Sequence, residues 1–201
     1  MSPSSASRRS DLFSLPNILT YSRVAAVPVV AGLLFWPEDH WSRWMALAIY
    51  IAAGITDYFD GYFARAYAQQ SQLGRMLDPI ADKLLVAACL LMLAADEAIA
   101  GVHLWAAIVI LCREVLVSGL REYLAELKVG MPVSRVAKWK TAAQLVALGF
   151  LIAGPAGEAV VPYTTEIGLA LLWVAAALTI YTGWDYLKLG IDAVVERDGR
   201  P

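Results

Sequence analysis

Apolar residues recur along the chain in six long runs that short polar links separate. Each run is close to the roughly 20 mostly apolar residues that a helix needs to cross a bilayer. The links are rich in proline, glycine or charge, which favours turns over continued helix. The pattern predicts an all-α polytopic membrane protein with six transmembrane helices in one domain, 1–201. The runs cover residues 18–35, 43–67, 79–95, 104–123, 138–154 and 167–187.

The segment before the first run resembles a secretory signal in its order of charge and apolar residues. Arg8 and Arg9 precede the apolar run, but the run is longer than a signal core and no small-x-small cleavage site follows it. We therefore predict that the run is a retained first span. Leu12 and Phe13 beside the two arginines favour a short interfacial segment, so 1–14 is predicted to be a cytoplasmic or interfacial N-terminus.

The composition agrees with a lipid environment. Of the 201 residues, 59% are hydrophobic and 17% are charged, whereas soluble domains are about half apolar and a quarter charged. The formal net charge of −2 gives no indication of nucleic-acid binding. Both cysteines, Cys89 and Cys112, lie in apolar runs and form neither a disulfide framework nor a metal motif, so we interpret them as packing residues.

Lysine and arginine are distributed unequally between the two sets of links. If the N-terminus is cytoplasmic, the outer links contain Arg43, and the other fifteen of the sixteen Lys and Arg residues are cytoplasmic or within helices. Because cytoplasmic links carry the excess of positive charge, both termini and the tail 188–201 are predicted on the cytoplasmic side of a bacterial-type inner membrane. The outer links instead hold the acidic residues Glu38, Asp39, Asp96, Glu97 and Glu158.

Four aspartates lie where the second run ends and the third begins. Asp57 and Asp60 are three residues apart and share a face of a helix. Asp78 and Asp82 are four apart and share a face if both are helical, although Asp78 before Pro79 could instead cap a helix. Asp57 lies about 21 Å along its run at 1.5 Å per residue, which is the cytoplasmic third of the hydrocarbon.

Four carboxylates at this depth need compensating charge. One uncompensated charge at the centre of a span costs about 2.5–3.5 kcal/mol on insertion scales. Divalent cations remove this cost, and oxygen ligands suit Mg²⁺ or Mn²⁺, of which we expect two ions. Such a cluster favours phosphate chemistry, because the ions bridge and neutralise phosphoryl oxygens. Gly61 leaves room for a ligand near the backbone, and Arg65 offers a guanidinium for a phosphate.

The spacing of these residues resembles the signature of the CDP-alcohol phosphotransferase family, D-x2-D-G-x2-A-R-x8-G-x3-D-x3-D. All eight positions match. They are Asp57, Asp60, Gly61, Ala64, Arg65, Gly74, Asp78 and Asp82.

The resemblance implies six transmembrane helices, a homodimer and a polar cavity open to the cytoplasm. It implies that Asp57, Asp60 and Asp78 bind metal and that Asp82 is the catalytic base, which also touches the metal. In the same way it implies that the CDP moiety lies against Asp57 and against Gly61, Ala64 and Arg65.

Further motifs are similar to those of the phosphatidylglycerophosphate synthases within this family. The first is Leu15-Pro16-Asn17 with Thr20 and Arg23, and we assign Asn17 to the CDP site. The others are Arg113-Glu114 followed by Arg121-Glu122, and Lys138-x-Lys140-Thr141, although Ala137 stands where glycine is expected before the first lysine. The residues assigned to the acceptor's phosphate are Arg113, Arg121, Lys138 and Lys140.

Depth in the membrane supports a special role for Arg113. It lies about 15 Å from the start of its run, and an arginine there must face the protein interior or water. Its partner could be Glu114 or an aspartate of the cluster, or it could face the cavity and hold the acceptor's phosphate. Arg121, Lys138 and Lys140 lie nearer the cytoplasmic face, where a cation needs no other explanation.

The resemblance implies transfer of a phosphatidyl group from CDP-diacylglycerol to glycerol 3-phosphate, with membrane lipid as the surroundings of the acyl chains. Within the family, phosphatidylglycerol as acceptor would make the protein a cardiolipin synthase, and an inositol phosphate would make it a phosphatidylinositol phosphate synthase. An alternative of another class is a metal-ion or proton transporter. Transport favours acidic groups spread through the membrane depth or broken helices, whereas these aspartates gather at one face.

Overall fold

The computed structural model describes residues 15–198 apart from 37, 68–71, 128 and 130–134, and these described residues form six α-helices and no strand. The all-α prediction is confirmed, while the predicted interfacial segment 1–14 lies outside the described residues. The helices are α2 (Leu15–Leu34), α3 (His40–Tyr67), α4 (Gln72–Ala95), α5 (His103–Glu126), α6 (Arg135–Glu158) and α7 (Thr164–Asp198).

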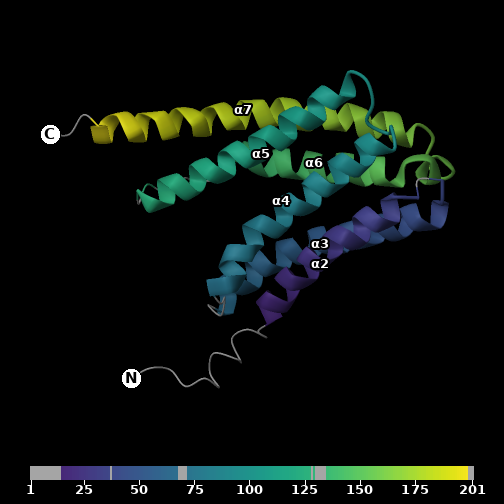
Figure 1. The fold of residues 1–201 in the computed structure, drawn as a ribbon, viewed down its shortest axis with the longest axis horizontal. Helices are drawn as coiled ribbons and strands as arrows, with labels where there is room; N and C mark the ends of the chain where they lie inside the picture. The colour runs from purple at the N-terminus through teal and green to yellow at the C-terminus, as the bar shows by residue number, and fades with distance from the viewer. Residues whose placement is uncertain (1–14, 37, 68–71, 128, 130–134, 199–201) are drawn as a thin grey trace.

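The helices run up and down through the molecule. The links α2–α3, α4–α5 and α6–α7 gather at one end, and the last turns of α3, α5 and α7 and the first turns of α2, α4 and α6 lie toward the other end (Figure 1). The acidic links therefore share an end, as the sequence predicts. Helix α6 packs along α7 and against α3, α2 packs against α3 and α4, and α5 packs against α7.

Four helices are long and apolar enough to cross a membrane by length and composition, namely α2, α5, α6 and α7. Their outward faces carry large apolar side chains that are more than half exposed, such as Trp105 on α5 and Ile180 on α7. The side chains buried between helices are also apolar, for example Val30 on α2, Leu148 on α6 and Leu172 on α7. A helix that is apolar on all sides is typical of a membrane span.

Helix α4 begins earlier than the apolar pattern predicts. The run was predicted from residue 79, but the helix starts at Gln72 and contains Pro79. Asp78 thus lies inside the helix and does not cap it, so the alternative of a cap is wrong. The apolar pattern marks where a chain can enter hydrocarbon, whereas the helix extends through the polar residues before that point.

Helix α6 breaks at Gly154, where the predicted fifth run ends. Gly154 has φ 44° and ψ −130°, a conformation that only glycine adopts readily, and Pro155 follows it. A Cβ on Gly154 would lie 2.7 Å from Nη1 of Arg43. The glycine therefore provides both the turn and the space for an arginine from α3.

Arg43 ties three helices together at this end of the molecule. Its Nη2 donates to Oδ2 of Asp96 at 2.5 Å, and both side chains are at least 96% buried. Its Nη1 donates to the carbonyl oxygens of Leu151 and Ile152 at 3.4 and 3.3 Å. The group of Arg43, Asp96 and Gly154, called here the Arg43 clamp, fixes α3 against the end of α4 and the break in α6.

Helix α3 is capped beside this clamp by Asp39. The Asp39 carboxylate accepts hydrogen bonds from the backbone N–H groups of Trp41 and Ser42, and from the Ser42 hydroxyl at 2.6 Å. These are the donors that a helix N-terminus leaves without an intrahelical partner. The hydrogen bond from Ser42 lowers the pKa of Asp39 below its usual value, so the cap stays charged at neutral pH.

Candidate functional site

The four signature aspartates lie on two consecutive helices joined by a short link. Asp57 and Asp60 are in the last turns of α3, and Asp78 and Asp82 are in the first half of α4. Both pairs therefore lie in helical backbone, where residues three or four apart share a face, as the sequence predicts. The side chains of Asp57, Asp60 and Asp78 lie outside the described residues. The same holds for the three residues of α3 that are predicted to contact the CDP moiety, Gly61, Ala64 and Arg65.

Helix α2 presents a buried polar face at the end where α3 and α4 are linked. Asn17, Thr20 and Arg23 are spaced by three residues and are at most 2% exposed. Helix α2 packs on both α3 and α4, so this face turns toward the two helices that carry the aspartates. Buried polar groups are retained where they find polar partners. Asn17 was predicted at the CDP site, and the fold places it on this face.

Asp82 has a described side chain. It is exposed on α4, and its charge acts on Lys140 of α6 and on the buried Tyr50 of α3. The last of the four aspartates therefore lies toward the helix that carries the predicted acceptor-binding lysine. Proton transfer requires a carboxylate close to the hydroxyl that it deprotonates, so the predicted role of Asp82 requires an acceptor bound between α4 and α6.

A carboxylate joins two of the four predicted acceptor-binding cations. Oε1 of Glu114 accepts a hydrogen bond from Nη1 of Arg113 at 3.4 Å and another from Nζ of Lys140. The three side chains are between 7% and 14% exposed. We call Arg113, Glu114 and Lys140 the Glu114 cluster. It connects α5 to α6, and it holds two positive charges and one negative charge away from water.

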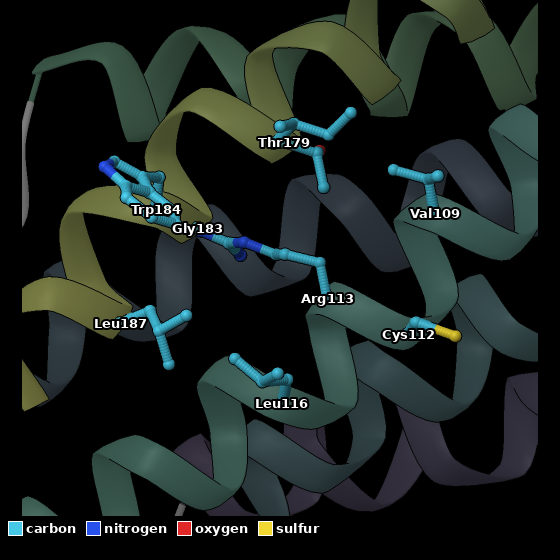
Figure 2. A pocket seen from close by; sticks show the side chains of 9 residues that line it. Val109, Cys112, Arg113, Leu116, Thr179, Gly183, Trp184 and Leu187 are labelled. Carbon is cyan, nitrogen blue, oxygen red and sulfur yellow. The ribbon is translucent and has the colours of Figure 1, made fainter. Parts of the chain in front are cut away.

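Arg113 is held by α7 as well. Its Nη2 donates to Oγ1 of Thr182 at 3.1 Å, and its guanidinium lies over the ring of Tyr186 at 5.6 Å from the centroid. Figure 2 shows the side chain reaching from α5 to Gly183 of α7. A Cβ on Gly183 would lie 3.1 Å from Cγ of Arg113, so the glycine permits the close approach. Of the partners considered for Arg113, Glu114 is one that the structure shows, whereas the side chains of Asp57, Asp60 and Asp78 lie outside the described residues.

The same arginine forms part of a groove between α5 and α7 with a volume of about 300 Å³ (Figure 2). Apolar side chains from both helices line most of it, including Leu116, Trp184 and Leu187. Thr179 at its edge is fully buried, and its hydroxyl has no hydrogen-bond partner among the described residues. The groove follows the outer, apolar surface of the two helices.

The other two predicted cations lie outside the Glu114 cluster. Arg121 is exposed, but it is near enough to Arg113 for the two charges to repel. Lys138 is exposed as well, and it precedes Lys140 by two residues, which places the two lysines on opposite sides of α6. The structure therefore brings Arg113 and Lys140 together, with Arg121 nearby and Lys138 on the far side.

Two buried polar groups on the helices of the predicted site residues received no role from the sequence. Arg23 is an arginine within an apolar run, and its depth alone could have identified it. Gln144, one turn after Lys140, is buried, and its side-chain carbonyl has no hydrogen-bond partner among the described residues. Its position one helical turn from a predicted ligand was the available signal.

A divalent metal ion needs a group of hard oxygen donors. Where side chains are described, no three His, Cys, Asp or Glu residues come together as a metal site, and three of the four aspartates fall outside that set. The donor set still fits a divalent ion, because two carboxylates on each of two consecutive helices supply hard oxygen ligands. The polar face of α2 beside them also suits a charged site.

Comparison with known proteins identifies the family of this chain. The CDP-alcohol phosphatidyltransferase family model matches residues 13–181. A protein of Cereibacter sphaeroides is 40% identical over 88% of this chain and 95% of its own length, and one of Rickettsia typhi is 45% identical over 87% and 96%. Both are named CDP-diacylglycerol–glycerol-3-phosphate 3-phosphatidyltransferase. An Arabidopsis thaliana protein of the same name, with the number 2, is 38% identical over 92% of this chain and 83% of its own length.

The aspartate spacing on α3 and α4, the buried cations on α5 and α6, and the match over most of the chain lead to one conclusion. This chain belongs to the CDP-alcohol phosphatidyltransferase family.

Proposed function

We propose that this chain transfers the phosphatidyl group of CDP-diacylglycerol to glycerol 3-phosphate, giving phosphatidylglycerophosphate and CMP. The names of relatives that share 40–45% of its sequence support this reaction. The observation that carries the choice of acceptor is the Glu114 cluster, in which two buried cations share one carboxylate. Such a site has positive charge left over for a phosphate.

The acceptor's charge distinguishes the candidate reactions. Glycerol 3-phosphate carries a compact phosphomonoester that can be a dianion, whereas phosphatidylglycerol carries a phosphodiester with a single charge and two acyl chains. A phosphomonoester therefore gains more from two convergent cations. Arg113 supplies a planar fork for phosphate oxygens and Lys140 a compact charge. Both features favour glycerol 3-phosphate over phosphatidylglycerol.

We place the protein across a bacterial-type inner membrane with six spans, α2 to α7. Helices α3 and α4 are included because their polar residues can face the site and not lipid. The termini, the α3–α4 link and the site would then face the cytoplasm, with residues 1–14 at the interface. We also propose a homodimer, for which the family resemblance is the support.

Asp57, Asp60, Asp78 and Asp82 would hold divalent metal, Mg²⁺ or Mn²⁺, as two ions. When bound, the metal neutralises negative charge on the pyrophosphate of the CDP-lipid and on the leaving group. Gly61, Ala64 and Arg65, with Asn17 on α2, would line the site of the CDP moiety.

The reaction follows from what each side chain can do. Arg113 and Lys140 bind the acceptor's phosphate and so orient its sn-1 hydroxyl toward α4. Asp82 accepts the proton of that hydroxyl. The hydroxyl oxygen forms a bond to the β-phosphorus of CDP-diacylglycerol, and the bond from that phosphorus to the bridging oxygen breaks. CMP leaves with the bridging oxygen, and the acyl chains remain in lipid throughout.

An assay of the purified protein with CDP-diacylglycerol, Mg²⁺ or Mn²⁺, and a panel of acceptors tests the proposal. CMP release should require glycerol 3-phosphate and should produce phosphatidylglycerophosphate. Faster release with phosphatidylglycerol or an inositol phosphate would assign the protein to another reaction of the family. Equal rates with glycerol would contradict a role for the acceptor's phosphate. Metal uptake into sealed vesicles without any CMP release would instead support a transporter.

A further inference from the structure

Glu114 is the one carboxylate of the Glu114 cluster, and the proposed chemistry gives it no step. We propose that it is a positioning residue, which holds Arg113 and Lys140 at a common point so that both can bind the acceptor's phosphate. The inference rests on the proposed function, since it concerns the affinity for an anionic acceptor. The inference gives a role to the acidic side chain that lies between Arg113 and Lys140.

The geometry of the shared oxygen supports this role. A single atom, Oε1 of Glu114, accepts from Nη1 of Arg113 on α5 and from Nζ of Lys140 on α6. Two flexible cationic side chains from different helices therefore converge on one point. Without the carboxylate, two like charges would face each other in an environment of low dielectric constant and would move apart.

The two cations depend on Glu114 to different degrees. Arg113 also donates to Thr182 and lies over Tyr186, so α7 holds it independently. Lys140 has Glu114 as its hydrogen-bond partner among the described residues, and no second one is found there. An ammonium group on a four-carbon stem has many rotamers. Glu114 should therefore act mainly through Lys140.

The net charge of the Glu114 cluster explains why the negative charge of Glu114 does not prevent the acceptor's phosphate from binding. Two positive charges and one negative charge leave one positive charge in the cluster. A second carboxylate in the cluster would neutralise this remaining charge. Without any carboxylate, the two cations would repel each other. Asp82 of α4 also attracts Lys140, more weakly than Glu114 does.

The test is the dependence of the rate on glycerol 3-phosphate concentration in the full-length protein. Glu114→Gln keeps the shape and one acceptor oxygen but removes the charge. It should raise KM for glycerol 3-phosphate about ten-fold, the effect of losing one charge-assisted contact, with kcat and KM for CDP-diacylglycerol changed less than about three-fold. Glu126→Gln is the matched control, because Glu126 is exposed at the end of the same helix, and it should change none of these values.

A double-mutant cycle separates positioning from a general effect on folding. In a Lys140→Met background, Glu114→Gln should raise KM for the acceptor by less than about two-fold, because residues that act as a unit are not additive. A carboxylate that only supports the fold would give the same factor in both backgrounds and would contradict the inference. If Glu114→Gln does not fold, Glu114→Asp keeps the charge at shorter reach. It should then raise KM for the acceptor above the wild-type value.

The outcomes also distinguish this inference from the proposed function. If the wild-type protein shows no CMP release that depends on glycerol 3-phosphate, the proposed function fails. If it does, but Glu114→Gln leaves the acceptor's KM unchanged, the inference about Glu114 alone is wrong. A lowered KM would also overturn it, because Glu114 would then be a competitor that the phosphate displaces.

Discussion

Buried cations in this chain differ in how completely acidic side chains neutralise them. Arg43 forms an ion pair with Asp96, and its Nη1 donates to the carbonyl oxygens of Leu151 and Ile152. Arg113 and Lys140 instead share the single carboxylate of Glu114. A neutral pair is typical of a structural contact, whereas an excess of positive charge suits an anionic ligand. The balance of charge thus distinguishes a structural ion pair from an anion-binding site.

Asp82 is the residue whose proposed role is most directly testable. Asp82→Asn keeps the size of the side chain but removes its ability to accept a proton, so turnover should fall by about 10² or more. CMP release measured at saturating acceptor checks this, and binding of CDP-diacylglycerol in the presence of metal should survive. Asp192→Asn, at an exposed position of α7, serves as the control. Near-normal turnover of Asp82→Asn would rule out Asp82 as the base.

At the scale of elements, the apolar pattern predicts the existence and order of all six helices. It places two of their ends poorly. Helix α4 starts at Gln72 instead of residue 79, and α7 continues to Asp198 instead of ending at 187. Hydrogen bonding along the backbone continues where polar residues replace apolar ones. Hydrophobicity therefore indicates which part of a helix can lie in lipid and leaves the remainder undetermined.

The Arg43 clamp should contribute strongly to stability because its ion pair is buried. Asp96→Asn removes the counter-charge of a buried arginine, which costs about 3–5 kcal/mol. The midpoint of thermal unfolding in detergent should fall accordingly. Replacing both partners, as in Arg43→Met with Asp96→Leu, should recover most of the loss. Glu97→Gln is the control at an exposed neighbouring position. If it lowered the unfolding midpoint as much as Asp96→Asn, the stabilising role of the Arg43–Asp96 pair would be contradicted.

The break in α6 can be tested by adding one methyl group. Gly154→Ala places a Cβ at positive φ and 2.7 Å from Nη1 of Arg43, so it should destabilise the fold by more than about 1 kcal/mol. Gly149→Ala lies five residues earlier in the same helix, where a Cβ would meet Leu47 Cδ1 at 3.7 Å, an ordinary contact. Thermal unfolding should be altered by the first substitution and not by the second. Equal midpoints for the two variants would show that the turn tolerates a side chain.

At the scale of the whole molecule, the sequence predicts which links lie together but not which side chains meet. The alternation of six runs places the acidic links at one end and the aspartate segment toward the other. Pairs such as Arg113 with Thr182, or Lys140 with Glu114, join residues 69 and 26 positions apart. They depend on the rotation of each helix about its axis, which the apolar pattern leaves undetermined for helices that are apolar on every side.

The proposed orientation predicts which links an impermeant thiol reagent reaches. In a background without Cys89 and Cys112, single cysteines at Asp39 and Glu158 should react from outside intact cells. A cysteine at Gln70, in the link between α3 and α4, should react only after the membrane is opened. The reason is that the helix ends flanking positions 39 and 158 lie at the opposite end of the bundle from the last turn of α3 and the first turn of α4 (Figure 1). Labelling of position 70 in intact cells would reverse the orientation.

Helix α7 is longer than a membrane is thick. Its 35 residues span about 52 Å at 1.5 Å per residue, against a hydrocarbon core of about 30 Å. If its first turn lies at the outer surface and the helix stands upright, its last residues rise about 20 Å above the inner one. Helix α7 would thus hold a fluorescent protein fused to the C-terminus away from the lipid headgroups and from the substrates that approach there.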